Sequence, residues 1–493
     1  MSQRFESIED AVAIEVVEDA VFAADALDDV SEDGSHWDGL QMPRMLFAIL
    51  AVMLAIALSV IDGVIVNIAL PTICSALSIT ASESIWVVNI YQISIITSLL
   101  PLSAMGDVVG YRRLFRIGLI IFILMSVGCA LSWSFGALLF FRAAQGFGAS
   151  CLMSIGTSLV RLIYPRRMLG RGLGINSTVV SVSSVAGPTI AASILALGDW
   201  RWLFAINIPI GVAAIIMGWL FLPANPIKLK SMSDYRWRDA LLNLLAFAST
   251  FAFFTSFSHN LDWWILIVEG AVAVVVGYIY VKSQLNSPLP ILPFDLLKIP
   301  IFSLSVVTSI LSFVAQMATM VAMPFILQHQ FGYTPIEVGV VLTAWPAVNM
   351  IATPISGFLV ERSNPGLLGM VGLVILTIGM SLLIFIPDEP TKSDLIWRLT
   401  ICGLGFGIFQ SPNNSLIIAS APLARSGSAS GMMATARLAG QTLGASLVAL
   451  LFYMIPKESM VSILSVGFIF SALAMILSFT RLSLPTPEAL IRR

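Results

Sequence analysis

The chain has 493 residues, of which 58% are hydrophobic and 11% are charged, and its mean hydropathy is +0.93. This composition excludes an ordinary soluble globular domain and indicates a protein with many membrane-spanning segments. The four cysteines are scattered singly through apolar segments, so a CxxC motif and a cysteine–histidine metal site are excluded as well.

The first 44 residues differ in character from the rest of the chain. They contain 12 acidic residues and two arginines, so the total charge of −2 combines an acidic tail with a basic remainder. Such charge density predicts a disordered cytoplasmic tail, although the alternation of acidic and apolar residues between Ile8 and Val30 would also suit an amphipathic helix. The tail lacks the basic start and apolar stretch of a signal peptide. It could bind a partner, act as a regulatory lid, or precede a true start at Met42 or Met45.

The rest of the chain divides into apolar runs that are bounded by charges or by glycine and proline. Each run is long enough to cross a bilayer as a helix. The fourteen runs cover residues 45–70, 85–105, 114–132, 135–160, 172–197, 202–222, 240–258, 263–282, 302–326, 336–360, 367–387, 395–420, 428–453 and 461–480. The sequence therefore predicts an all-α polytopic membrane protein with 14 transmembrane helices.

The positions of arginine and lysine indicate the orientation of these helices. If both termini are cytoplasmic, 18 basic residues between and after the spans fall on the cytoplasmic side and 4 on the other side. This asymmetry follows the positive-inside rule. With one helix fewer, the basic residues of all later loops would change sides and the asymmetry would be lost. We therefore expect a multi-pass protein of the cell (inner) membrane with both termini in the cytoplasm.

Two loops repeat one pattern of glycine, an acid and arginine. Residues 106–113, after the second run, read GDVVGYRR, and residues 357–362, after the tenth run, read GFLVER. Internal repeats with a binding site at their interface are the usual architecture of secondary transporters. The predicted units are the tail at 1–44, a six-helix bundle at 45–222, an insertion with helices 7 and 8 at 223–300, a second six-helix bundle at 301–480 and a short cytoplasmic tail at 481–493.

Two charged residues stand inside the apolar runs of the first bundle. Asp62 lies in the first run and Arg142 in the fourth, and burying either charge in hydrocarbon is costly, so each marks a candidate functional site. Each lies about eight or nine residues from the outer end of its run, which at ~1.5 Å per residue gives both a depth of roughly 12 Å. An arginine favours the ionised form of a nearby acid, and solvent or substrate can shift that balance, so the pair could exchange a proton for cargo. The alternative is a static pair that only joins two helices.

Several short motifs surround these two residues in a characteristic order. They are Asp62 to Pro71 in the first helix; Asp107, Gly110, Arg112 and Arg113 after the second; Arg142 to Gly146 in the fourth; Gly187 and Pro188 in the fifth; and Asp199 to Gly211 at the start of the sixth. With these motifs, the chain from Met45 onward resembles the 14-spanner drug:proton antiporter family of the major facilitator superfamily. It departs from the family pattern at Ser103, at Ala191 and Ala192, and at Leu438, where the family usually has a glycine, a glycine pair and a glutamine.

The resemblance implies a role for each motif. Asp62 would bind the proton, and Arg142 would tune that binding. The loop motif after the second helix would lock one conformation through charge pairs and helix ends, the alternative being charges that only set the topology. Gly187 and Pro188 would bend the fifth helix at the interface between the two bundles.

Polar and aromatic residues elsewhere in the helices are candidates for the substrate path. These candidates are Asn67, Trp86, Tyr91, Gln145, Trp345, Gln410, Asn413, Arg437 and Gln441. Arg437 is a charge in an apolar segment without an evident acidic partner, so it could bind an anionic group in a cavity or pair with a backbone carbonyl. The polar run from Gln410 to Asn414 could line the path or bind neighbouring helices.

Together with the resemblance, these features predict a proton-coupled secondary transporter that exports amphipathic, cationic drugs or toxic compounds by alternating access, and so confers antibiotic or biocide resistance. The proton gradient would supply the energy, with no metal, no cofactor and no nucleic acid, and in a Gram-negative host a periplasmic adaptor and an outer-membrane channel could be partners. An exporter of a metabolite, lipid, peptide or siderophore is the alternative, and a non-transporting receptor or scaffold is a remote one.

A membrane enzyme is not expected because His36, His259 and His329 form no catalytic constellation, and ATP coupling is disfavoured because a glycine-rich phosphate loop with lysine is lacking.

Overall fold

The structure is a computed structural model that describes residues 39–165, 168–223, 235–256, 263–285, 292–360, 362–387, 389–422, 425–454 and 459–484. The predicted acidic tail up to residue 38 and the predicted C-terminal tail from residue 485 lie outside the described residues. The regular elements of the described part are helices, in agreement with the predicted all-α class.

The long helices follow the predicted apolar runs closely, except that the sixth run is broken into α8 and α9 at Ile206. The elements before the predicted insertion are α2 (Arg44–Leu77), α3 (Ala81–Ser84), α4 (Trp86–Val109), α5 (Tyr111–Ala130), α6 (Phe135–Ile163), α7 (Leu169–Leu197), α8 (Trp202–Ala205) and α9 (Asn207–Phe221). Within the insertion lie α10 (Trp237–Ser256), α11 (Trp263–Leu285) and the short turn η3 (Leu296–Lys298). The elements that follow are α12 (Pro300–Phe325), η4 (Ile326–Gln330), α13 (Pro335–Val360), α14 (Pro365–Ile384), α15 (Lys392–Ala419), α16 (Ser426–Met454) and α17 (Ser459–Arg481).

Twelve stretches of helix in the described residues are long and apolar enough to cross a membrane. They include every long helix except α10 and α15, and α15 contains the polar run from Gln410 to Asn414. The protein is therefore an integral, multi-pass membrane protein. A span at α10 and at α15, and with it the total of fourteen, stays a prediction.

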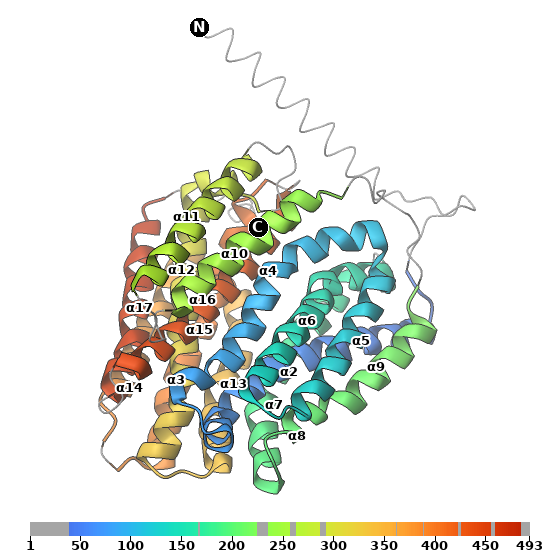
Figure 1. Ribbon diagram of the computed structural model, residues 1–493. Helices are drawn as coiled ribbons and strands as arrows, with labels where there is room; N and C mark the ends of the chain where they lie inside the picture. Colours follow the sequence, from blue (N-terminus) through green and yellow to red (C-terminus); the bar gives the residue numbers. More distant parts are fainter. Residues whose placement is uncertain are drawn as a thin grey trace, which may run out of the picture.

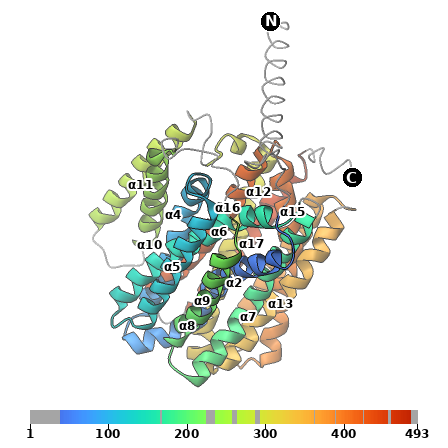
Figure 2. The same cartoon turned by 90° about the vertical axis from the view of Figure 1, so that its right-hand side faces the viewer.

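Two groups of helices pack side by side and meet along one interface (Figures 1 and 2). In the first half, α2–α9, helix α2 packs on α6, α7 and α9, and α6 packs on α4 and α5. In the second half, α12–α17, helix α15 packs on α13 and α14, and α12 packs on α16 and α17. The halves meet where α7 contacts α13, α4 contacts α16 and α2 contacts α12.

Helices α10 and α11 lie beside the two halves, and Figure 2 shows them at the left edge of the molecule. Helix α10 packs on α4 and α16, and α11 packs on α10. Asn243 of α10 donates a hydrogen bond to the hydroxyl of Tyr280 at 2.6 Å, and Ser283 of α11 donates to the carboxylate of Asp239 at 3.0 Å. Much of the apolar surface of α11 is exposed, as at Val274, so this helix faces the hydrocarbon in a membrane.

The bundle has two ends, named here the Arg44 end and the Leu77 end after the limits of α2. At the Arg44 end, α4 joins α5 through Gly110, whose φ of 99° would be strained for a residue with a side chain. At the Leu77 end, Thr80 and Glu83 form a capping box that begins α3. These short connections fix the neighbouring helices antiparallel to one another.

Candidate functional site

A buried ion pair lies in the middle of the first half. One carboxylate oxygen of Asp62 accepts a hydrogen bond from Arg142 Nη1 at 2.5 Å, and the other accepts from Gln145 Nε2 at 3.0 Å and from Asn207 Nδ2 at 2.7 Å. Gln145 Nε2 also donates to the hydroxyl of Ser126 at 2.8 Å. All five residues are fully buried, and we call them the Asp62 cluster.

Arg142 is bonded or covered on several sides. Its Nε donates to the carbonyl of Val87 at 3.2 Å, and its Nη1 donates to Gln145 Oε1 at 2.7 Å. Its guanidinium carbon lies 4.1 Å from the ring centre of Tyr91 and 5.5 Å from that of Phe204, and such cation–π contacts stabilise a desolvated cation. A buried ion pair offsets its desolvation only when its remaining donors and acceptors are also bonded, so these contacts make the two charges tolerable here.

The predicted contact between Asp62 and Arg142 is confirmed, and helix geometry explains it. Arg142 and Gln145 are three residues apart on α6 and therefore share the face that contacts α2. Asn207 comes from the first turn of α9, directly after the break that separates α8 from α9. The sequence analysis missed Asn207 and Ser126 as members of the cluster, and the available signal was a polar side chain within an otherwise apolar run.

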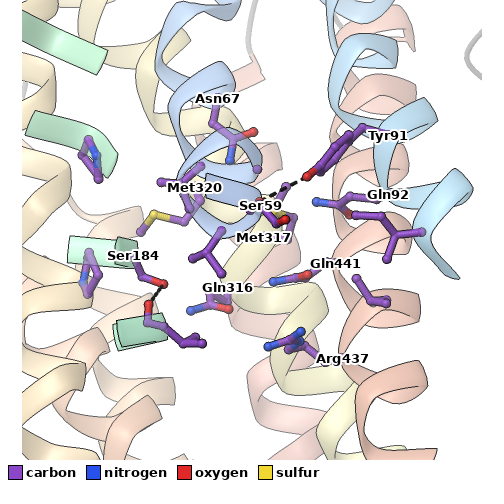
Figure 3. Close-up of a pocket in the computed structure, with 18 of the residues that line it drawn as sticks. Ser59, Asn67, Tyr91, Gln92, Ser184, Gln316, Met317, Met320, Arg437 and Gln441 are labelled. Atoms are coloured by element: carbon purple, nitrogen blue, oxygen red, sulfur yellow. Dashed lines mark hydrogen bonds between the residues drawn. The ribbon is translucent and has the colours of Figure 1, made fainter. Parts of the chain in front are cut away.

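A cavity of about 1090 Å³, counting its opening to solvent, lies between the two halves. Its walls come from α2, α4, α6 and α7 of the first half and from α12, α13 and α16 of the second. The polar residues of the wall, which Figure 3 labels, are Ser59, Asn67, Tyr91, Gln92, Ser184, Gln316, Arg437 and Gln441. The remaining wall is largely apolar and includes Met153, Met317 and Met320, whose flexible side chains can adapt to ligands of different shape.

Tyr91 lies between the cavity and the Asp62 cluster. It lines the cavity, its ring covers the guanidinium of Arg142, and its hydroxyl donates to the carbonyl of Ser59 at 3.1 Å (Figure 3). Neither Asp62 nor Arg142 is among the described residues that line the cavity. The ion pair is therefore adjacent to the cavity but separated from it in this conformation.

The residues predicted for the substrate path fall into different places. Those that line the cavity are Asn67, Tyr91, Trp345, Arg437 and Gln441. Gln145 lies in the Asp62 cluster, and Asn413 accepts a hydrogen bond from Arg481 at 2.7 Å, so it joins α15 to α17. Trp86 and Gln410 lie outside the described lining. Polar lining residues that the sequence analysis did not single out are Gln92, Ser184 and Gln316.

The loop motif between α4 and α5 is described in part, because the side chain of Asp107 lies outside the described set. Arg112 and Arg116 both donate to the carbonyl of Trp219 in α9, at 2.9 and 3.2 Å. Arg113 is exposed. These arginine contacts stay within the first half, and the role of the motif in locking one conformation stays a prediction.

Gly187 and Pro188 lie where α7 approaches both α2 and α13. A Cβ atom at Gly187 would come within 2.8 Å of Val64 in α2. The carbonyl oxygen of Pro188 lies so close to α13 that a Cβ atom at Gly339 would be 2.8 Å from it. Glycine at these positions allows close approach of the helices at the interface between the halves.

Five hydrogen bonds of described residues join the halves, and all of them lie in the part of the bundle nearer the Leu77 end. They link Ser82 to the Ala449 carbonyl at 2.9 Å, Asn89 to Ser446 at 3.2 Å, Thr442 to Gln92 at 3.4 Å, Thr189 to Thr343 at 3.1 Å and Gln328 to the Ile68 carbonyl at 3.4 Å. Cavity residues such as Val180 and Arg437 lie nearer the Arg44 end of their helices. The halves are therefore hydrogen-bonded to each other on the Leu77 side of the cavity.

Comparison with known proteins gives one consistent family. Residues 52–445 and 305–490 match the family model described as Major Facilitator Superfamily. The uncharacterized transporter YebQ of Escherichia coli (strain K12) is 46% identical over 452 residues, which cover 92% of this chain and 99% of that protein. The riboflavin transporter RibZ of Clostridioides difficile (strain 630) is 29% identical over 403 residues, covering 82% and 87% of the two chains. The multidrug efflux pump LfrA of Mycolicibacterium smegmatis (strain ATCC 700084 / mc(2)155) is 27% identical over 416 residues, covering 83% and 81%.

A solved structure shares the arrangement of helices. A POT family transporter in complex with a thioalcohol-conjugated peptide has a TM-score of 0.67 and 14% identity, and the match covers 89% of this chain and 96% of that one. The two halves with a cavity between them are thus the fold of a membrane transporter, and the chain is not an enzyme. On its sequence match, its relatives and its fold, the chain belongs to the Major Facilitator Superfamily.

Proposed function

We propose that this protein exports small amphipathic molecules in exchange for protons, and that Asp62 is the residue that takes up and releases the proton. The observation that carries the proposal is the Asp62 cluster, in which a fully buried carboxylate pairs with Arg142 beside a cavity between the halves. Charge at this depth in a membrane is costly and marks an ion or substrate path. A site at the interface of two repeated halves is where secondary transporters bind their substrates.

Protonation of Asp62 would remove the negative charge that Arg142 now contacts. Arg142 would then be a buried cation without an anionic partner, which destabilises the present packing of α2 against α6. The halves can respond by rocking about the cavity, which opens the contacts at the Leu77 end and closes the opposite side. In this way the proton and the cargo would each cross with one change of conformation.

The names of the relatives support two versions of this proposal. LfrA is named as a multidrug efflux pump, which favours export of varied toxic compounds and fits the methionine-containing wall of the cavity. RibZ is named as a riboflavin transporter, which favours a second candidate function, the transport of one specific metabolite. Both versions use the same cavity and the same proton site.

We place the protein in the cell (inner) membrane with both termini in the cytoplasm, so that the Leu77 end faces outward. In that orientation the described conformation is closed to the outside. Its energy source is the proton gradient, without a cofactor, and a periplasmic adaptor and outer-membrane channel would be partners only in a Gram-negative host.

The proposal is tested by dye efflux from energised cells that express the protein. Ethidium, a lipophilic cation, and 8-anilinonaphthalene-1-sulfonate, an amphipathic anion, are followed by fluorescence with and without a protonophore. We expect the wild type to export at least one of the two dyes, only while the proton gradient persists, and Asp62→Asn to abolish that export. The matched control is Asp199→Asn, which changes an exposed carboxylate paired with Arg201 and should leave efflux unchanged.

A second variant separates loss of function from loss of fold. Asp62→Asn leaves Arg142 as an unpaired buried cation, which costs about 3–5 kcal/mol of stability. The double variant Asp62→Asn/Arg142→Gln removes both charges, so it should fold and still fail to export. Proton-driven efflux by a folded variant without the Asp62 carboxylate would refute the proposal.

A further inference from the structure

Arg437 of α16 is half-buried on the wall of the cavity. Its Nε is buried without a hydrogen bond, and the side chain has no hydrogen-bond or ion-pair partner among the described residues. A half-buried cation without a protein acceptor is costly, since it has lost part of its hydration and gained no hydrogen bond from the protein in exchange. The position therefore points to a ligand that supplies the missing acceptors.

The buried arginines show how this protein bonds such groups with its own side chains and carbonyls. Arg142 pairs with the carboxylate of Asp62. Arg398 donates to two backbone carbonyls at the end of α14, and Arg481 donates to polar side chains of α12, α15 and α17. Arg437 has no equivalent contact within the described ranges, so a structural role seen there does not account for its charge.

The charge of Arg437 is not offset within the cavity. No aspartate or glutamate is among the described residues of the wall. Asp62 is not among the described residues of the wall and already pairs with Arg142. In the low dielectric of a protein interior, one uncompensated positive charge attracts an anion and repels a cation strongly.

Neighbouring side chains complete a surface for an anionic, partly apolar molecule. Gln441 is one helical turn from Arg437 and shares its face of α16, and Gln316 of α12 also lines the cavity (Figure 3). The indole Nε1 of Trp345 is a further buried donor without a hydrogen-bond partner in the part of the chain that the structure describes. Hydrogen-bond donors therefore stand beside methionines and an aromatic ring in the same wall.

We propose that the cargo is an amphipathic organic anion, with its carboxylate or sulfonate bound to Arg437 and its apolar body against the methionine-containing wall. This inference rests on the proposed transport function and specifies its substrate class. It reverses the cargo charge that the family resemblance implies, because a cation in the cavity would face Arg437 with no described carboxylate to bind it. The planar guanidinium can hold such an anion through two parallel hydrogen bonds.

The test is equilibrium dialysis of the full-length protein in lipid nanodiscs against three probes of matched shape. The probes are 1-naphthaleneacetate, the neutral 1-naphthaleneacetamide and the cation trimethyl(1-naphthylmethyl)ammonium, with empty nanodiscs correcting for binding to lipid. We expect the wild type to bind the anion at least ~10-fold more tightly than the other two probes. One charge-assisted hydrogen bond is strong enough to supply a difference in affinity of this size. Arg437→Gln should remove that preference while leaving the affinity for the neutral probe within about two-fold.

Two variants serve as controls. Arg437→Lys keeps the charge and should retain part of the anion preference, and Arg238→Gln removes an exposed arginine outside the cavity and should behave as the wild type. Equal affinities of wild type for the three probes, tighter binding of the cation, or an anion preference that survives Arg437→Gln would overturn the inference. The Asp62-dependent efflux assay is independent of this result, so an intact proton-driven efflux with no anion preference refutes the cargo charge alone.

Discussion

Tyr91 contacts two different environments with one side chain. One face of its ring lies 4.1 Å from the guanidinium carbon of Arg142, and the residue also forms part of the cavity wall. Its hydrogen bond to the carbonyl of Ser59 holds the ring in this place. Access of water from the cavity to the Asp62 cluster therefore depends on the position of the Tyr91 ring.

Replacing Tyr91 tests that dependence. Tyr91→Ala deletes the ring, so water in the cavity should reach the Asp62 cluster and protons should leak through the protein without cargo. The measurement is proton entry into proteoliposomes that contain a pH-sensitive dye. Tyr91→Phe keeps the ring over Arg142 and loses only the hydrogen bond to Ser59, worth about 0.5–1.5 kcal/mol. This variant should therefore leak no more protons than the wild type. A leak in Tyr91→Ala no greater than in the wild type would contradict this role.

The residues of the site were predictable to different degrees. Asp62 and Arg142 stand out because a charge in an apolar run is rare, and their matched depth predicts their contact. Asn207 and Ser126 carry no charge, and their approach to Asp62 depends on the rotation of α9 and α5 about their axes, which an apolar run does not specify. For the same reason Gln316 lines the cavity while Gln410, equally polar in sequence, does not.

Among the helices, close packing in the first half depends on glycines that bring backbones together. A Cβ atom at Gly148 of α6 would lie 2.8 Å from the backbone nitrogen of Phe122 and 2.9 Å from the carbonyl oxygen of Gly118, both in α5. Backbone atoms cannot rotate away as a side chain can. A larger residue at this position would therefore force α5 and α6 apart, together with the Asp62 cluster that α6 supports.

Gly148→Ala should lower the stability of the protein by roughly 1–3 kcal/mol, the usual cost of overpacking. The matched control is Gly277→Ala in α11, where a Cβ atom would meet nothing within 4 Å. That change should be neutral or stabilising by up to about 1 kcal/mol, because alanine favours a helix more than glycine does. Thermal denaturation midpoints of the two purified variants compare them directly, and equal midpoints would show that the α5–α6 contact tolerates a methyl group.

The helices themselves were more predictable than their packing. The apolar run at 135–160 became α6, Phe135–Ile163, since length and hydropathy alone define a span. The break between α8 and α9 was not predicted, because hydropathy averaged over the run does not register single residues such as Asn207 and Pro209, which closely follow Ile206. The acidic tail lacks an apolar run of that length, and its disorder or amphipathic helix stays a prediction because residues 1–38 lie outside the described part of the chain.

For the whole molecule, the contacts between the halves define which side is closed. The hydrogen bonds that join the halves gather toward the Leu77 end, and under the proposed alternating access they would break in each cycle. Individually these bonds are weak, about 0.5–1.5 kcal/mol each. A few such contacts can hold one conformation while leaving the reverse change accessible.

A disulfide across this interface should stop transport. Asn89→Cys with Ser446→Cys, in a background without the native cysteines, replaces two side chains that are 3.2 Å apart in opposite halves. Oxidation should abolish efflux, and a reductant should restore it. The control pair, Ser283→Cys with Asp239→Cys, links α10 to α11, whose contacts need not change between conformations, and should leave efflux intact. Full efflux by the oxidised Asn89–Ser446 pair would show that this contact does not open.

If the proposed exchange of a proton for an anion operates, the charge of Arg437 also determines how the protein responds to membrane voltage. With one proton entering through Asp62 for each cargo anion that leaves, every cycle moves two positive charges inward. Each elementary charge that crosses 100 mV is worth about 2.3 kcal/mol, so this exchange would gain about 4.6 kcal/mol at that potential. A cation exchanged for one proton would be electroneutral and would gain nothing. In the proposed exchange, a single guanidinium in the cavity would thus decide whether the electrical potential of the cell, in addition to its pH gradient, drives export.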